Sequence, residues 1–130
     1  MFFAGIFVCR HKTLCNHHSI FVCDNKKKGE LIMKASVAIQ VLPDTDSKEK
    51  LIYIVDRVID YIASTGLNYY VGPFETTIEG DSYDELMEIV KNCQKVALKA
   101  GCSSVSAYVK IRYNENGVLT IDEKISKHHK

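Results

Sequence analysis

The sequence contains no apolar run that approaches the roughly 20 residues needed to span a bilayer, so it predicts no membrane-spanning segment. It also lacks a strong excess of one charge, because the formal net charge is only +1 and the residues after position 32 are mildly acidic. A mildly acidic domain without a basic stripe argues against nucleic acid as a partner and favours a neutral or cationic ligand. The five cysteines follow no regular disulfide framework, which favours reduced thiols and a cytoplasmic location.

Motifs for catalysis are missing as well. The chain has no glycine-rich phosphate loop, no H-E-x-x-H sequence and no nucleophile elbow. After position 32 the only histidines are His128 and His129, so the cysteines of that region have no nearby base in the sequence. Glu75 and Glu79 lie on one expected strand with Cα atoms roughly 13 Å apart, too far for a typical glycosidase pair. We therefore predict that the protein is not an enzyme and uses no cofactor.

Residues 1–32 differ in composition from the rest of the chain. Their cysteines and histidines lack the C-x2-C and H-x3-H pairs of structural zinc sites, so we predict no metal site at Cys9, His11, Cys15, His17, His18 and Cys23. The codons for Lys28-Gly29-Glu30 can spell AAGGAG, a ribosome-binding sequence, a short distance before Met33. The regular apolar pattern begins just after Met33. We therefore interpret residues 1–32 as a disordered extension or as untranslated sequence, and residues 33–130 as the ligand-binding domain.

Residues 33–130 alternate between strand-like and helix-like patterns. Alternating side chains predict strands at residues 34–42, 67–71, 74–80 and 103–113. Apolar residues at helical spacing predict two long helices, which end near Gly66 and Gly101. A short terminal helix is expected over residues 121–127. Three pairs of residues have the spacing of a capping box at a helix start: Asp46 with Glu49, Ser82 with Glu85, and Thr120 with Glu123.

The order β-α-β-β-α-β is the split βαβ or ferredoxin-like arrangement. We therefore predict an α+β fold, a ferredoxin-like βαββαβ sandwich in which two helices pack on one face of an antiparallel four-stranded sheet. The other face, called the open face from here on, would be uncovered in a single chain. Side-chain parity predicts the residues on the open face: Ser36, Ala38, Gln40, Asn68, Tyr70, Glu75, Thr77, Glu79, Ser106, Tyr108, Lys110 and Arg112.

The open face mixes small residues, hydroxyls, tyrosines and a few charges. A solvated face would carry more Lys and Glu, and a structural dimer face would be more aliphatic. The mixture suits a partly buried interface that contains a polar pocket. Because parity aims Glu79 at the open face, we expect this side chain to be accessible. Its replacement by glutamine would then change stability by only about half a kcal/mol.

Four stretches carry a resemblance to a known family: residues 36–43, 64–69, 72–80 and 119–125, of which T-x-I-E-G at 76–80 is the most specific. Through them, residues 34–127 resemble the thiamine-binding protein family of small YkoF-like proteins. The resemblance implies a ferredoxin-like fold and dimers that assemble into tetramers. It also implies binding of thiamine or its hydroxymethylpyrimidine moiety, without catalysis.

The chemistry of such a ligand indicates which side chains would bind it. An aminopyrimidine offers a ring-nitrogen acceptor and an amino donor, which a carboxyl or amide group can satisfy while a tyrosine stacks on the ring. A thiazolium cation favours carboxylates and aromatic faces. The candidate ligand-binding residues are Ser36, Gln40, Tyr70, Thr77 and Glu79. The alternative function is a homo-oligomeric interaction module without a thiamine ligand, whose open face only builds the assembly.

Overall fold

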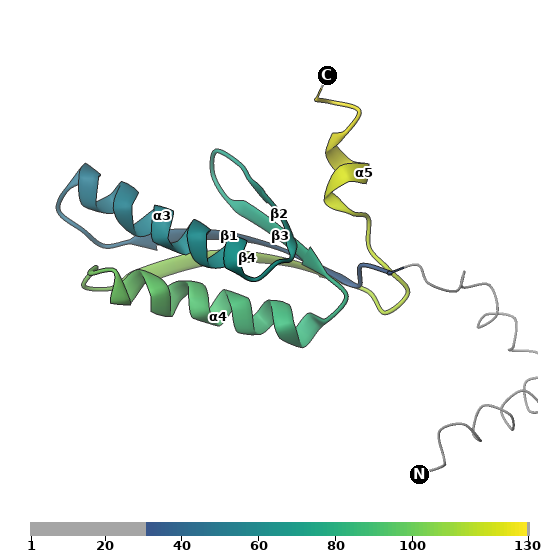
Figure 1. Cartoon of the computed structure of the whole chain (residues 1–130), viewed down its shortest axis with the longest axis horizontal. Helices are drawn as coiled ribbons and strands as arrows, with labels where there is room; N and C mark the ends of the chain where they lie inside the picture. The colour runs from purple at the N-terminus through teal and green to yellow at the C-terminus, as the bar shows by residue number, and fades with distance from the viewer. Residues whose placement is uncertain (1–30, 130) are drawn as a thin grey trace, which may run out of the picture. The chain divides into compact units, whose positions relative to one another are not determined.

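The computed structural model describes residues 31–129 of the chain. Residues 32–130 form one compact unit, which begins one residue before the predicted domain boundary at Met33. The predictions made for residues 1–30 lie outside the described residues. The helices and strands follow the expected order (Figure 1): β1 (Ala35–Pro43), α3 (Lys48–Ser64), β2 (Asn68–Val71), β3 (Thr76–Gly80), α4 (Tyr83–Lys99), β4 (Val105–Tyr113) and α5 (Ile121–Ile125).

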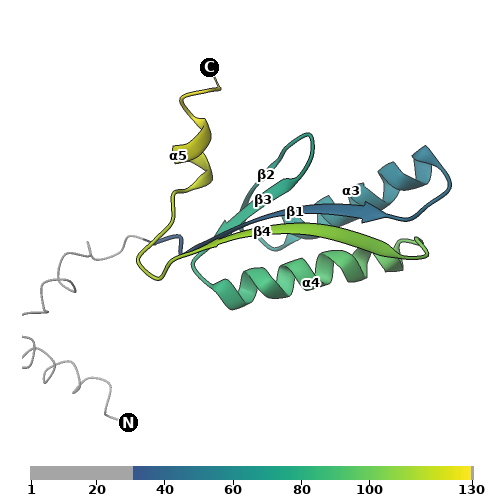
Figure 2. The ribbon, with the colours of Figure 1, turned by 180° about the vertical axis from the view of Figure 1, so that it is seen from behind.

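The four strands form one sheet in the order β2-β3-β1-β4, and each neighbouring pair is antiparallel. Helices α3 and α4 pack against each other and against the sheet, and the two views in Figures 1 and 2 place them on the same side of it. This arrangement confirms the predicted ferredoxin-like fold. The described residues include no helix that is long and apolar enough to cross a membrane.

Helix α3 begins one residue later than the capping-box spacing indicated. The N-cap is Ser47, whose Oγ accepts a hydrogen bond from the Lys50 amide at 3.1 Å, so the expected N-cap Asp46 is wrong. Serine and aspartate are about equally good N-caps, and their neighbouring positions could not be separated by residue type alone. After the helix, Gly66 has a φ of +78°, a left-handed conformation that glycine adopts easily.

The other two helix starts agree with the sequence. The Oγ of Ser82 accepts from the Glu85 amide at 3.2 Å at the start of α4. At the start of α5, Thr120 and Glu123 form a complete capping box, in which each side chain accepts from the other residue's amide. These contacts satisfy amides that the first helical turn leaves without partners.

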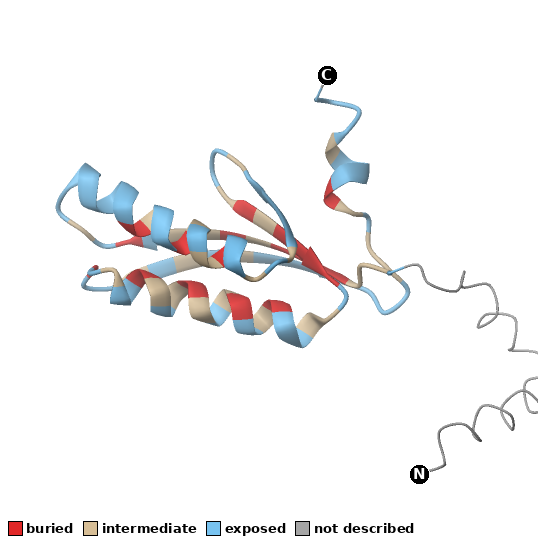
Figure 3. Ribbon diagram, in the orientation of Figure 1, coloured by how far each residue is buried: buried red, intermediate tan, exposed pale blue. Residues whose placement is uncertain are grey.

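The core lies between the sheet and the two long helices. Figure 3 shows buried residues along β1 and β3 and on the sides of α3 and α4 that face the sheet. Most are aliphatic, and each such side chain contributes roughly 1.5–3 kcal/mol when fully buried. The main members of the core are Val37, Ile39, Ile54, Val58, Ile62, Ile78, Leu86, Ile89, Cys93 and Ala97.

Candidate functional site

The face opposite α3 and α4 carries polar and aromatic side chains in ordered rows. Cross-strand neighbours on one face of a sheet have Cβ atoms about 5 Å apart, so the members of a row can touch. The strand register defines two adjacent rows across the sheet: Asn68, Glu79, Ser36 and Arg112 in the first, and Tyr70, Thr77, Ala38 and Lys110 in the second.

Helix α5 and the residues after it contact the first two rows. The Ile121 amide donates to Glu79 Oε2 at 2.6 Å. The Nζ of Lys124 donates to Ser36 Oγ at 3.4 Å. These contacts mean that the end of the chain covers part of the face that the sequence left uncovered.

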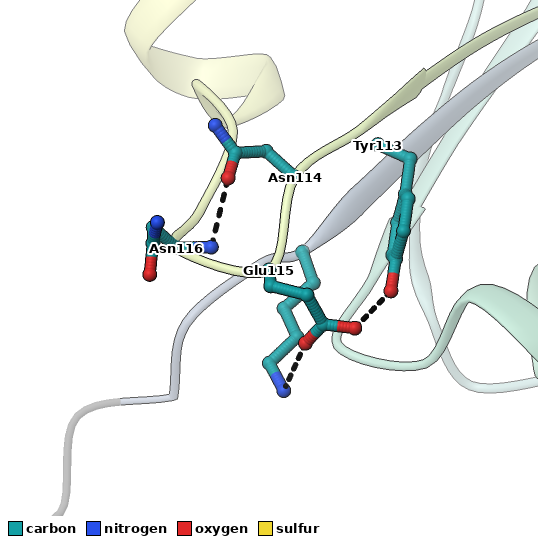
Figure 4. Close-up of polar contacts among 5 residues, drawn as sticks. Tyr113, Asn114, Glu115 and Asn116 are labelled. Carbon is teal, nitrogen blue, oxygen red and sulfur yellow. Dashed lines mark hydrogen bonds and ion pairs between the residues drawn. The ribbon is translucent and has the colours of Figure 1, made fainter.

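A turn after β4 sets the place where α5 begins. The Asn116 amide donates to Asn114 Oδ1 at 2.9 Å, and the Tyr113 hydroxyl donates to the Glu115 carboxylate (Figure 4). The hydrogen bond to Glu115 is the main cause that raises the pKa of Tyr113 above its ordinary value. Gly117 has a φ of +115°, and a Cβ there would meet a side-chain carbon at 3.0 Å. The turn therefore requires glycine at this position.

Glu79 is almost fully buried, with only 3% of its surface exposed. Its Oε1 accepts from Asn68 Nδ2 at 2.6 Å, and its Oε2 accepts from the Ile121 amide. Buried carboxylates are normally paired in this way. The expectation that Glu79 is accessible is therefore wrong: the side chain points to the predicted face, but α5 covers it.

The candidate ligand-binding residues share one face but differ in access. Ser36 and Glu79 are neighbours across β1 and β3, and both are buried. Tyr70 and Thr77 are neighbours across β2 and β3 in the next row, and Tyr70 is exposed. Gln40 lies one row further along β1 and is half-buried. The structure thus groups these five residues on one surface, of which Ser36 and Glu79 form the covered end.

The tail after α5 adds a further contact to this surface. The rings of Tyr70 and His129 lie 6.0 Å apart between centroids and are tilted by 59°. That distance is within the range of favourable aromatic pairs. The sequence alone does not predict this contact, because the position of the tail depends on the turn after β4.

A separate cavity of about 280 Å³ lies between α3 and the β2–β3 hairpin. It is slightly smaller than typical small-molecule pockets, which begin at roughly 300 Å³. Its walls are largely aliphatic, and Phe74 at its rim is 79% exposed. Of the candidate ligand-binding residues, only Gln40 lines it. The cavity therefore has an apolar surface with little hydrogen-bonding capacity.

The cysteines of the described residues are both buried. Burial raises the pKa of the Cys93 thiol to about 12, so this side chain stays protonated at neutral pH. The Sγ of Cys102 lies 3.1 Å from the Ala97 carbonyl oxygen and donates to it. A buried, protonated thiol is a poor nucleophile. Between residues 31 and 129, no cluster of His, Cys, Asp and Glu side chains has the composition to hold a metal ion.

The sheet topology and the polar open face define a small ferredoxin-like protein. The amino-acid sequence identifies the family. A family model described as "Thiamine-binding protein" matches residues 37–129. The chain therefore belongs to the thiamine-binding protein family, as the motifs at 36–43 and 72–80 indicated.

Known proteins similar to this chain agree with that assignment. A UPF0045 protein of Clostridium perfringens is 45% identical over 93 residues, which cover 72% of this chain and 95% of the relative. A domain of unknown function, DUF77, from Bacillus cereus has a similar structure, with a TM-score of 0.67, 33% identity, and coverage of 75% of this chain and 92% of that one. A candidate thiamine biosynthesis/salvage protein of Thermotoga maritima gives a TM-score of 0.65 at 34% identity. The match covers 74% of this chain and 99% of that one.

Proposed function

We propose that this protein is a cytoplasmic, non-catalytic protein that binds thiamine or its hydroxymethylpyrimidine moiety on the open face. Membership of the thiamine-binding protein family supports a small-molecule ligand. The name of the Thermotoga relative supports thiamine as that ligand. The observation that carries the proposal is the pairing of Tyr70 with Thr77, which sets an aromatic ring beside a hydroxyl, near His129 in the tail after α5.

The proposed binding mode follows from the chemistry of these side chains. The aminopyrimidine ring stacks on Tyr70, while the Thr77 hydroxyl and the Gln40 amide supply donors and acceptors for its edge. The thiazolium cation lies near the aromatic rings of the face. Ser36 and Glu79 form the base of the site, and Glu79 acts there by holding α5 in place.

Tyr70→Ala is expected to weaken thiamine binding about tenfold, because the stacked ring contributes roughly 0.5–1.5 kcal/mol beyond its buried area. Calorimetric titration of the full chain with thiamine and with hydroxymethylpyrimidine measures both affinities. The two ligands should lose affinity by the same factor, because the pyrimidine is the part that stacks.

The matched control for this experiment is Tyr53→Ala. Tyr53 lies on α3, is 53% exposed, and contacts Arg57 rather than the open face. This variant should bind thiamine as the wild type does. If the wild type binds neither ligand, the proposed function is wrong; if both tyrosine variants bind equally well, the ligand does not stack on Tyr70.

We also propose that the chain assembles into a homotetramer, a dimer of dimers. Aromatic side chains stay exposed on the open face of the single chain, since Tyr70 is 38% and Tyr108 is 68% exposed. Aromatic side chains are enriched at protein–protein interfaces. If assembly were the only role of this face, the protein would be an interaction module without a thiamine ligand.

Light scattering on the purified full chain should give four times the chain mass at micromolar concentration. Tyr108→Asp should lower that mass, because it replaces an exposed aromatic ring of the proposed contact with a charge. Tyr53→Asp, on the outer side of α3, should leave the mass unchanged. A monomeric wild type would contradict burial of the open face in an assembly.

A further inference from the structure

The open face carries two cations that form no ion pair with any carboxylate of residues 31–129. Arg112 lies directly opposite Ser36 in the register of β1 and β4. Lys124 reaches the same serine from α5, with Nζ 3.4 Å from Ser36 Oγ. Because cross-strand neighbours have Cβ atoms about 5 Å apart, the guanidinium and the ammonium group can both reach the space beside Ser36.

The acidic groups of the open face are already engaged elsewhere. Glu79 accepts from Asn68 and from the Ile121 amide. Glu75 pairs with Lys110 at 2.6 Å. On α5, Asp122 precedes Lys124 by two residues, a spacing that does not bring side chains together on a helix. Neither cation beside Ser36 therefore forms a direct ion pair within the described chain, and the Glu79 carboxylate in the same row is held by the two neutral donors.

Ser36 supplies a further donor at the same place. Its side chain is nine-tenths buried, with 6% of its surface exposed. The Oγ accepts from Lys124, and its own proton has no acceptor among the described residues. The Ser36 hydroxyl and the Lys124 ammonium group are in contact, and Arg112 is the exposed cross-strand neighbour of Ser36. An anion beside Ser36 would accept hydrogen bonds from the hydroxyl, the ammonium group and the guanidinium.

We infer that Ser36, Arg112 and Lys124 form an anion subsite that binds the phosphate of a phosphorylated ligand. This inference rests on the proposed function and adds that the preferred ligand is a phosphate monoester of thiamine. The planar guanidinium binds phosphate through paired hydrogen bonds, and the lysine adds a point charge. Thr77 and Arg112 lie two strands apart, about 10 Å across the sheet. An extended ligand can span that separation with its pyrimidine at one end and its phosphate at the other.

The test compares three ligands on the full chain by calorimetric titration: thiamine, thiamine monophosphate and inorganic phosphate. Thiamine monophosphate should bind about tenfold more tightly than thiamine, as expected for charge-assisted hydrogen bonds. Arg112→Gln and Lys124→Gln should each remove most of that preference while changing thiamine affinity less than about twofold. Inorganic phosphate should bind weakly and compete with the monophosphate but not with thiamine.

Lys95→Gln is the matched control, since Lys95 is exposed on α4, on the other side of the sheet. It removes the same charge and should leave the preference for the monophosphate intact. Equal affinities for thiamine and its monophosphate would overturn the subsite and leave the proposed function standing. A fall in assembly mass for Arg112→Gln with an unchanged preference would assign this arginine to a subunit contact and also overturn it. Failure of both thiamine compounds to bind would overturn the proposed function and this inference together.

Discussion

Replacing Glu79 with glutamine is expected to lower the free energy of unfolding by about 2–3 kcal/mol. Both carboxylate oxygens accept hydrogen bonds at 2.6 Å, from Asn68 and from the Ile121 amide. A glutamine carries no charge and has only one acceptor oxygen, which the Ile121 amide needs, so its amino group faces Asn68, whose side-chain amide must turn to accept from it. The loss comes from replacing two charge-assisted hydrogen bonds by weaker neutral ones. Urea unfolding of the wild type and the variant, monitored by circular dichroism, measures this change in the free energy of unfolding.

Glu75→Gln is the control, because Glu75 lies on the same face and forms a more exposed ion pair with Lys110. Exposed ion pairs contribute about 0–1 kcal/mol, so this variant should unfold almost as the wild type does. Hydrogen exchange gives a second readout: the Ile121 amide should exchange faster in Glu79→Gln and unchanged in Glu75→Gln. Equal stability of both glutamine variants would show that Glu79 does not hold α5.

The positions of the strands and long helices could be predicted because each follows from local periodicity. On β1, for example, Val37 and Ile39 face the core while Ser36 and Gln40 face the other way, as alternation requires. The antiparallel order followed from the sequence of elements, since the βαββαβ arrangement has few alternatives. Errors at this level were small, such as the N-cap at Ser47 rather than Asp46.

The covering of Glu79 could not be predicted because it depends on contacts between distant parts of the chain. Its partner, the Ile121 amide, is 42 positions away in the sequence. Parity determines the face on which a side chain lies, but not whether another element packs over that face. The place of α5 is set by the turn that contains Gly117, whose contacts involve residues ahead of β1.

Only part of the candidate site could be predicted from the sequence, because the rest depends on contacts between distant parts of the chain. Parity predicts that Ser36, Glu79, Tyr70 and Thr77 share one face. The strand register adds that Ser36 lies beside Glu79 and Tyr70 beside Thr77. The position of Lys124 beside Ser36 could not be predicted, because α5 is short and its direction is not encoded in an apolar stripe. The cavity beside Phe74 was also missed, since its shape depends on how far the β2–β3 hairpin stands from α3.

Ile78→Ala is expected to lower the free energy of unfolding by about 4 kcal/mol, the largest effect of a single substitution that we predict. Ile78 lies in β3 opposite Val37, and none of its surface is exposed. The alanine would leave a cavity beneath the helices, because a close-packed core relaxes only partly around removed methyl groups. Ile111 flanks Val37 on the other side, in β4, yet it is 47% exposed. Ile111→Ala should therefore cost only about 1 kcal/mol, since half of that side chain already contacts water. Urea unfolding of both variants under the same conditions measures the difference, and equal losses would contradict the burial of Ile78 relative to Ile111.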